Sequence, residues 1–181
     1  MAKQFGLPTA EKKDSQGICF IGEIDIRDFL KKYIPVEKGL VRTTSGREVG
    51  EHDGLAFYTI GQRQGIGIGG GIPYYVVDKE AATNTLVVAQ GPFDPALFAR
   101  SVEVVDMHWI FGTEPRLPIT CSARIRYRQA LEEMTLERKA NGVVRASFKN
   151  LQRAATPGQS IVFYHDGEML GGGCISRVDM A

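Results

Sequence analysis

The sequence contains few cysteines and few residues that could bind a metal. Its three cysteines are Cys19, Cys121 and Cys174. No two of them form a CxxC pair and their number is odd, which argues against a disulfide framework and indicates a reducing compartment. The three histidines are His52, His108 and His165. They are scattered along the chain without a second ligand at metal spacing, so we expect no zinc site.

The sequence also has no large excess of charge and no long apolar run. Lys and Arg total 22 and Asp and Glu total 21, which gives a net charge of +1. A nucleic-acid-binding surface must therefore be local, because the chain as a whole does not attract a polyanion. Neither a signal peptide, a lipidation motif nor an apolar segment of membrane-spanning length is recognisable. These features favour a cytoplasmic protein with no membrane partner.

Turn-forming residues, by contrast, are abundant. The chain has 21 glycines and eight prolines, and 43% of its residues are hydrophobic. Many turns combined with enough apolar side chains for a core predict a mainly β fold. We expect three parts: a short helical and extended segment in residues 1–34, a small β-rich domain in 35–97, and a six-stranded antiparallel β-barrel in 98–181.

Local patterns predict some elements in more detail. The β-branched and aromatic runs 73–78 and 85–89 predict an antiparallel hairpin. Asn141-Gly142 predicts a type I′ turn, in which both central residues have positive φ. The apolar spacing within residues 25–33 predicts a short amphipathic helix.

Cys19 lies in the short apolar run 17–22, which begins and ends with glycine. Two interpretations remain open from the residues alone. A free cysteine often behaves as a small buried hydrophobe, which would make Cys19 structural. A reactive thiol needs an electropositive, partly exposed setting, which Lys12 and Lys13 could provide although Asp14 opposes them.

A row of arginines is the main candidate for binding an anion. If residues 120–128 form one strand, alternation places Arg124, Arg126 and Arg128 on one face and Cys121 on the other. Arginines two apart on a strand are roughly 6.6 Å from each other, close to the spacing of phosphates along an extended backbone. Such a row could position a nucleic acid without reading its sequence.

An ordinary structural role for these residues remains an alternative. The arginine face could be a solvated strand face that pairs across a hairpin with Glu132, Glu133 or Glu137. We also expect Cys121 and Cys174 to be core residues.

The glycine-rich stretch 65–71 invites a phosphate-loop interpretation, which the sequence does not support. No Gly-Lys-Ser/Thr follows it, and no helical pattern begins where a phosphate would need a helix N-terminus. A flexible hairpin tip is the favoured structure. Its functional version is a loop that contacts RNA, with Gln62 and Arg63 donating hydrogen bonds.

Several runs taken together resemble the bacterial tRNA-specific 2-thiouridylases. The runs are KKDSQGICFIG, GEHDGLAFYTIGQRQGIGIGGG, YYVVDK, LVVAQG, RIRYRQ and TPGQSIVFY. The resemblance implies a C-terminal barrel similar to those of translation factors, and a sulfurtransferase that makes 2-thiouridine at the wobble position of tRNA. It also implies that Cys19 carries sulfur as a persulfide, and that a second cysteine outside this chain forms a disulfide with it.

The resemblance covers only the central and barrel portion of such an enzyme. It implies that ATP and Mg²⁺ are bound by a missing N-terminal domain, of which residues 1–34 are a remnant, and that a relay protein donates the sulfur. It maps tRNA contacts onto Arg126, Tyr127 and Gln159. Strict alternation cannot expose both Arg126 and Tyr127, so a bulge or the end of the strand is required. The alternative function is a stand-alone RNA-binding module with a structural Cys19.

Overall fold

The computed structural model of the chain describes residues 5–6, 29–69 and 71–181. The chain divides into two compact units, Met1–Val36 and Glu37–Ala181. Most of the first unit, including Cys19, lies outside the described residues. The predicted helix in residues 25–33 is described only from Phe29, where Phe29 and Leu30 are helical and a turn follows.

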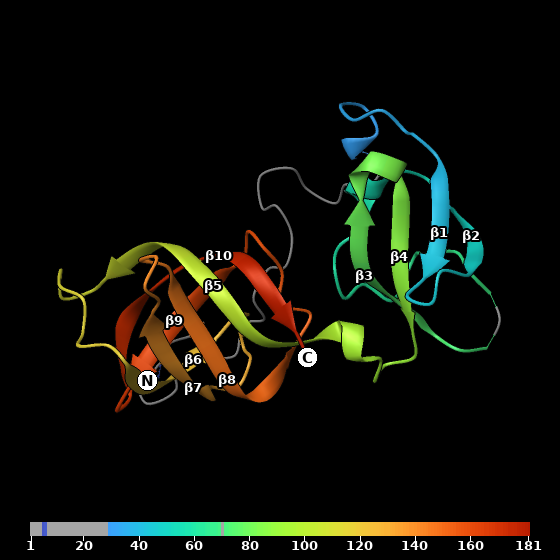
Figure 1. Cartoon of the computed structure of the whole chain (residues 1–181). Helices are drawn as coiled ribbons and strands as arrows, with labels where there is room; N and C mark the ends of the chain where they lie inside the picture. Colours follow the sequence, from blue (N-terminus) through green and yellow to red (C-terminus); the bar gives the residue numbers. More distant parts are fainter. Residues whose placement is uncertain (1–4, 7–28, 70) are drawn as a thin grey trace. The chain divides into compact units, whose positions relative to one another are not determined.

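The second unit begins with a four-stranded sheet and three short 3-10 helices (Figure 1). The strands are β1 (Gly39–Thr43), β2 (Glu48–His52), β3 (Tyr74–Glu80) and β4 (Thr85–Gln90). The 3-10 helices are η1 (Leu55–Phe57), η2 (Ala81–Thr83) and η3 (Pro95–Leu97). The strand order is β2-β1-β4-β3, with β1 parallel to β4 and the other pairs antiparallel. The hairpin predicted from runs 73–78 and 85–89 is therefore confirmed as β3 and β4.

A buried histidine fixes one end of this sheet. His52 is 1% exposed, and its Nδ1 accepts a hydrogen bond from the Gly54 N–H at 2.9 Å. Its Nε2 lies 3.0 Å from the Asn84 carbonyl oxygen, to which it donates. Gly39 passes so close that a Cβ there would lie 2.0 Å from the same carbonyl oxygen. Only glycine fits at this crossing, which explains the residue type at the start of β1.

The remaining strands form a closed barrel, as the sequence predicts. They are β5 (Phe98–Trp109), β6 (Ile119–Arg124), β7 (Glu132–Arg138), β8 (Val144–Arg153), β9 (Ser160–His165) and β10 (Glu168–Met180). The order around the barrel is β10-β5-β8-β7-β6-β9, and every neighbouring pair is antiparallel. Closure leaves the six strands without an unpaired edge. The mainly β fold with a six-stranded antiparallel barrel is confirmed.

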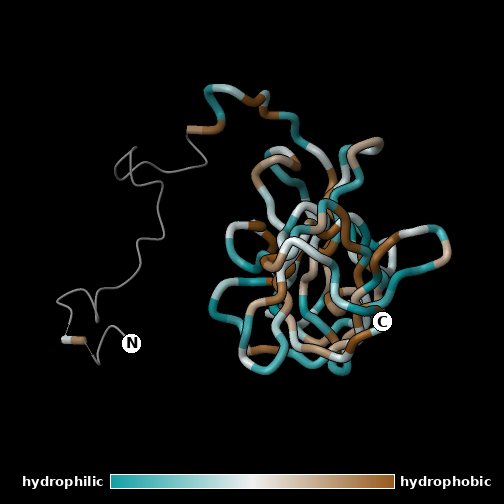
Figure 2. Tube along the Cα trace, turned by 90° about the vertical axis from the view of Figure 1, so that its left-hand side faces the viewer, coloured by the Kyte–Doolittle hydropathy of each residue, from teal (hydrophilic) through white to brown (hydrophobic). Residues whose placement is uncertain are grey.

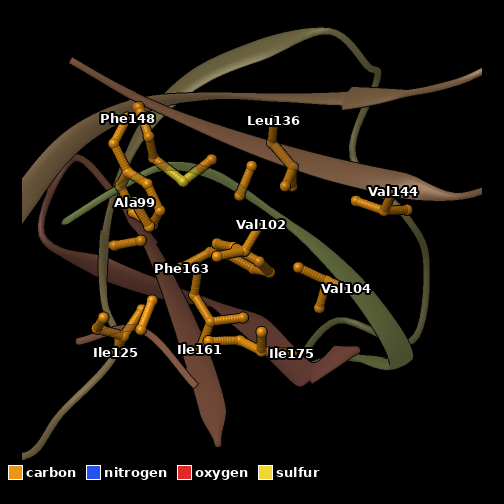
Figure 3. Packing of buried hydrophobic residues seen from close by; sticks show 14 of the residues in the cluster. Ala99, Val102, Val104, Ile125, Leu136, Val144, Phe148, Ile161, Phe163 and Ile175 are labelled. Atoms are coloured by element: carbon orange, nitrogen blue, oxygen red, sulfur yellow. The ribbon is translucent and has the colours of Figure 1, made fainter. Parts of the chain in front are cut away.

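Inward-facing apolar side chains fill the barrel (Figure 3). Phe163, Ile161, Leu136 and Ile175 are each 0% exposed, and Trp109 packs against this cluster from its margin. Hydrophilic residues mark several of the projecting loops in Figure 2. Because side chains two apart on a strand share a face, the period-two alternation of the sequence decides which strand residues form the core.

The turn at Asn141-Gly142 differs from the predicted type I′ turn. Gly142 has φ +83°, but Asn141 is not among the described residues with positive φ. The Gly142 N–H donates to the Lys139 carbonyl, and the Lys139 N–H donates to the Val143 carbonyl. This pattern is a type I turn followed by a glycine bulge, which needs positive φ at one residue only. The predicted domain boundary near Leu97 lies at η3 and stays a prediction.

Candidate nucleic-acid interface

The end of β6 controls how the candidate residues are exposed. The strand ends at Arg124, and residues 125–128 form a bend and a turn. Arg126 and Tyr127 are both exposed as a result, and Arg128 adopts φ +65° in the turn. The strand's end thus resolves the conflict that strict alternation creates. The predicted row of three arginines along one strand face is wrong, because only Arg124 belongs to the strand.

A surface groove joins the end of β6 to β9. We call it the β6–β9 groove; its volume is about 550 Å³. Its lining residues are Arg124, Ile125, Arg126, Tyr127, Gln159, Ser160, Val162 and Tyr164. The groove brings together Arg126, Tyr127 and Gln159, which are separate in the sequence. It contains two arginines and no carboxylate, so its local charge favours an anion.

The two groove arginines are held in different ways. The Arg126 Nη2 donates to the Ala154 carbonyl oxygen at 2.9 Å, which fixes one side of its guanidinium. The Arg124 guanidinium carbon lies 5.3 Å from the centre of the Tyr164 ring, a cation–π contact. The Arg124 Nε is buried and has no hydrogen-bond partner within the described chain. The two side chains therefore present different edges to the groove.

Gln159 and Tyr127 add uncharged polar groups. The Oε1 of Gln159 is buried without a partner among the described residues, while its backbone carbonyl accepts from the Ile175 N–H at 2.8 Å. The backbone of Gln159 is thus held in place, while the Oε1 of its side-chain amide makes no hydrogen bond within the described residues. Tyr127 is 80% exposed, and the Arg128 guanidinium carbon lies 5.4 Å from its ring centre. An exposed aromatic ring beside arginines is typical of RNA-binding surfaces.

Arg124 and Arg126 do not pair with the glutamates across the hairpin, which was the structural alternative for these arginines. Glu133 instead forms an ion pair with Lys149 at 2.9 Å, and Glu132 accepts a hydrogen bond from Asn150. Within the described parts of the chain, no ion pair joins Arg124 or Arg126 to an acidic residue.

Gln62 and Arg63 lie outside the β6–β9 groove. The Gln62 Oε1 accepts from the Thr59 N–H at 2.9 Å, and its Nε2 donates to the Gln64 carbonyl at 2.7 Å. This side chain therefore holds its own loop together. Arg63 is exposed and lines a separate cavity of about 450 Å³ together with the glycine-rich stretch. That stretch continues through Pro73 into β3, so it lacks the strand–loop–helix context of a phosphate loop.

The three cysteines differ in what the structure shows. Cys19 lies outside the described residues. Cys121 is 5% exposed as predicted, and burial raises the pKa of its thiol to about 11. The prediction that Cys174 is a core residue is wrong: it is half-buried and lines a second groove of about 410 Å³. The neighbouring Ile175 is 0% exposed and faces the core, so alternation along β10 turns Cys174 toward the outer face.

Sequence reasoning missed Tyr164 as a groove residue. In β9 the buried residues are Ile161 and Phe163, so alternation turns Ser160, Val162 and Tyr164 outward. The outward face of this strand is one wall of the groove. The alternation signal was present in the run TPGQSIVFY, but it does not reveal which strand lies beside β9.

The described residues contain neither a cluster of metal ligands nor a membrane-spanning helix. No three His, Cys, Asp or Glu side chains among them lie close enough together to hold a metal ion. None of the helices in that part of the chain has the length and apolar composition needed to cross a membrane.

Comparison with known proteins agrees with this architecture. Residues 27–90 match the family model of a tRNA methyl transferase PRC-barrel domain, and residues 99–175 match that of an aminomethyltransferase beta-barrel domain. The tRNA-specific 2-thiouridylase MnmA of Nitrosococcus oceani is 49% identical over 184 residues, covering 99% of this chain and 50% of that protein. The protein of the same name from Ralstonia pickettii is 49% identical, covering 100% of this chain and 50% of that protein.

The tRNA-specific 2-thiouridylase MnmA 2 of Geobacillus kaustophilus is 47% identical over 179 residues, covering 98% of this chain and 48% of that protein. The chain thus spans about half the length of the curated relatives it matches. Both family models and these relatives agree with the motifs found in the sequence. The chain belongs to the tRNA-specific 2-thiouridylase family and corresponds to its central and C-terminal β domains.

Proposed function

We propose that this chain is the part of a tRNA-modifying sulfurtransferase that docks tRNA and carries the sulfur for 2-thiolation of the wobble uridine. The relatives named as tRNA-specific 2-thiouridylases, at up to 49% identity, support the reaction. The observation that carries tRNA docking is the β6–β9 groove, which gathers Arg126, Tyr127 and Gln159 from two separate segments.

The chemistry of the groove suits an RNA backbone. Arg126 keeps donors other than its Nη2, and a guanidinium binds phosphate oxygens through several N–H groups at once. Gln159, Ser160 and the tyrosine hydroxyls can bond ribose and base atoms. Because no carboxylate lines the groove, nothing there repels the phosphates.

In this proposal the sulfur chemistry depends on Cys19. The Cys19 thiolate takes the outer sulfur from a persulfide on the relay protein, which is released as a thiol. The terminal sulfur of the Cys19 persulfide then attacks C2 of the uridine after ATP-dependent adenylation of the C2 oxygen, which leaves as AMP. A second cysteine, in the part of full-length relatives that this chain does not span, then forms a disulfide with Cys19 and leaves the sulfur on the uridine. ATP and Mg²⁺ belong to that same part, so the chain alone is expected to be inactive.

The first experiment measures binding of unmodified tRNA at salt concentrations of about 50 and 200 mM. The wild type is compared with the double variant Arg124→Gln, Arg126→Gln. The matched control is Arg100→Gln, Arg116→Gln, which removes the same charge from two exposed arginines that do not line the groove. We expect the groove variant alone to weaken binding and to flatten its salt dependence by about one to two phosphate contacts.

Equal effects of the two double variants would contradict tRNA docking at the groove. A reconstituted reaction tests the sulfur step separately: this chain, the missing domain, ATP, the sulfur donor and tRNA are mixed with wild-type or Cys19→Ser chain. Thiolation that persists unchanged with Cys19→Ser would favour the alternative of an RNA-binding module with a structural Cys19. The cytoplasmic location expected from the sequence belongs to the same proposal.

A further inference from the structure

We infer that the β6–β9 groove holds an unpaired nucleobase of the bound RNA, stacked on the Arg124–Tyr164 pair, and is not simply a track for phosphates. This inference rests on the proposed RNA-binding function and specifies what part of the RNA enters the groove. Tyr164 becomes a contact residue, and Arg124 acquires a role different from that of Arg126.

The first argument is the orientation of Arg124. Its guanidinium carbon lies over the Tyr164 ring at 5.3 Å from the ring centre, and its Nε is buried. An arginine that grips a phosphate side-on uses its Nε and one Nη together, and here the Nε edge is covered by protein. A guanidinium plane backed by an aromatic ring is instead a platform on which a base can stack. Arg124 lines the groove, so this platform faces the ligand space.

The second argument is the character of the surrounding wall. Val162 and Ile125 line the groove together with Arg124; Val162 is half-buried, whereas Ile125 is 4% exposed and belongs mainly to the barrel core. A phosphate placed against these apolar side chains would lose hydration without compensation, whereas the flat face of a base gains from the contact. The exposed ring of Tyr127 lines the same space and offers a second aromatic surface.

The third argument is the unsatisfied amide of Gln159. Its Oε1 is buried and unpartnered among the described residues, which normally costs free energy. A side-chain amide offers both a donor and an acceptor, as the edge of a base does. Because Oε1 makes no internal hydrogen bond, turning the amide toward a base breaks none through that oxygen. A phosphate, which only accepts, could satisfy just the NH₂ side.

The test separates base from backbone by using two RNA probes of equal charge. One is a single-stranded oligouridylate of about ten nucleotides, and the other is the same ribose-phosphate chain without bases. Both are titrated against wild type, Arg124→Lys and the control Arg100→Lys. Arg124→Lys keeps the charge but removes the planar stacking surface.

We expect the wild type to bind the oligouridylate roughly tenfold more tightly than the abasic chain. Arg124→Lys should remove most of this difference and leave both abasic binding and the salt dependence as they are. Tyr164→Leu should act in the same way, while Tyr164→Phe keeps the stack and the discrimination. Thermal unfolding of each variant verifies that the barrel is intact, and quenching of 2-aminopurine in a labelled strand reports stacking directly.

Equal affinity of the wild type for the two probes would overturn the inference, as would an Arg124→Lys variant that weakens both probes alike. In either case the proposed function stands as long as tRNA binding is salt-sensitive and is lost in the double glutamine variant of the groove. If the wild type binds neither tRNA nor either of the two probes, the proposed tRNA docking itself is overturned.

Discussion

The buried thiol of Cys121 should react with alkylating reagents far more slowly than the half-buried thiol of Cys174. Burial raises the pKa of Cys121 to about 11, compared with roughly 8.5 for a free cysteine. Near pH 8 this lowers the thiolate fraction from about a quarter to about one in a thousand, a decrease of roughly two orders of magnitude. The thiol is also only 5% exposed, so a reagent reaches it only when the barrel opens.

The assay is alkylation of the native chain near pH 8, followed by digestion and mass spectrometry of each cysteine peptide. We expect Cys121 to be modified at least about a hundredfold more slowly than Cys174 in the folded chain. The same reaction in denaturing urea is the control, because both thiols are then solvated and should react at similar rates. Native rates within about tenfold of each other would refute the reasoning from burial.

Two further predictions concern stability. The Arg145 side chain donates a hydrogen bond to the Asp179 carboxylate, and this bond is the main reason why the pKa of Asp179 lies below its usual range. A hydrogen bond from the Ser101 hydroxyl lowers the pKa further. The Asp179 carboxylate therefore stabilises the barrel above the ordinary pKa near 4 and loses this effect as the pH falls through the lowered pKa. Asp179→Asn should cost about 1 kcal/mol at neutral pH, and this cost should shrink progressively as the pH falls below about 4, as measured by urea unfolding. Gln62→Leu should destabilise its loop by about 1 kcal/mol because two hydrogen bonds are lost, without changing the affinity for RNA; a loss of affinity with unchanged stability would contradict the structural role of Gln62.

The barrel was predictable because its signal is local. Alternation in 120–128 places Cys121, Ala123 and Ile125 on one side, and all three are buried. Side chains two apart on a strand share a face wherever the strand runs, so the core positions follow from a few neighbouring residues. The predicted six strands depend on such runs and on the turns between them.

The end of a strand, by contrast, depends on its partner. The pairing of β6 with β9 runs from Ser122↔Tyr164 through Ala123↔Phe163 to Arg124↔Val162, and β6 ends there. Nothing within residues 120–128 marks this limit, because the partner strand lies about 40 positions further along the chain. The predicted arginine row therefore continues four residues past the end of the strand, from Arg124 to Arg128.

The same non-local pairing creates the candidate site. Once β6 ends opposite Val162, the chain at Arg126 and Tyr127 leaves the ladder, and both side chains become exposed beside β9. Gln159 lies just before β9 and lines the same groove. The motif residues are thus brought together by barrel closure, and none of them is positioned by its own segment alone. It follows that a variant that opens the β6–β9 pairing should weaken RNA binding even though every groove side chain is present.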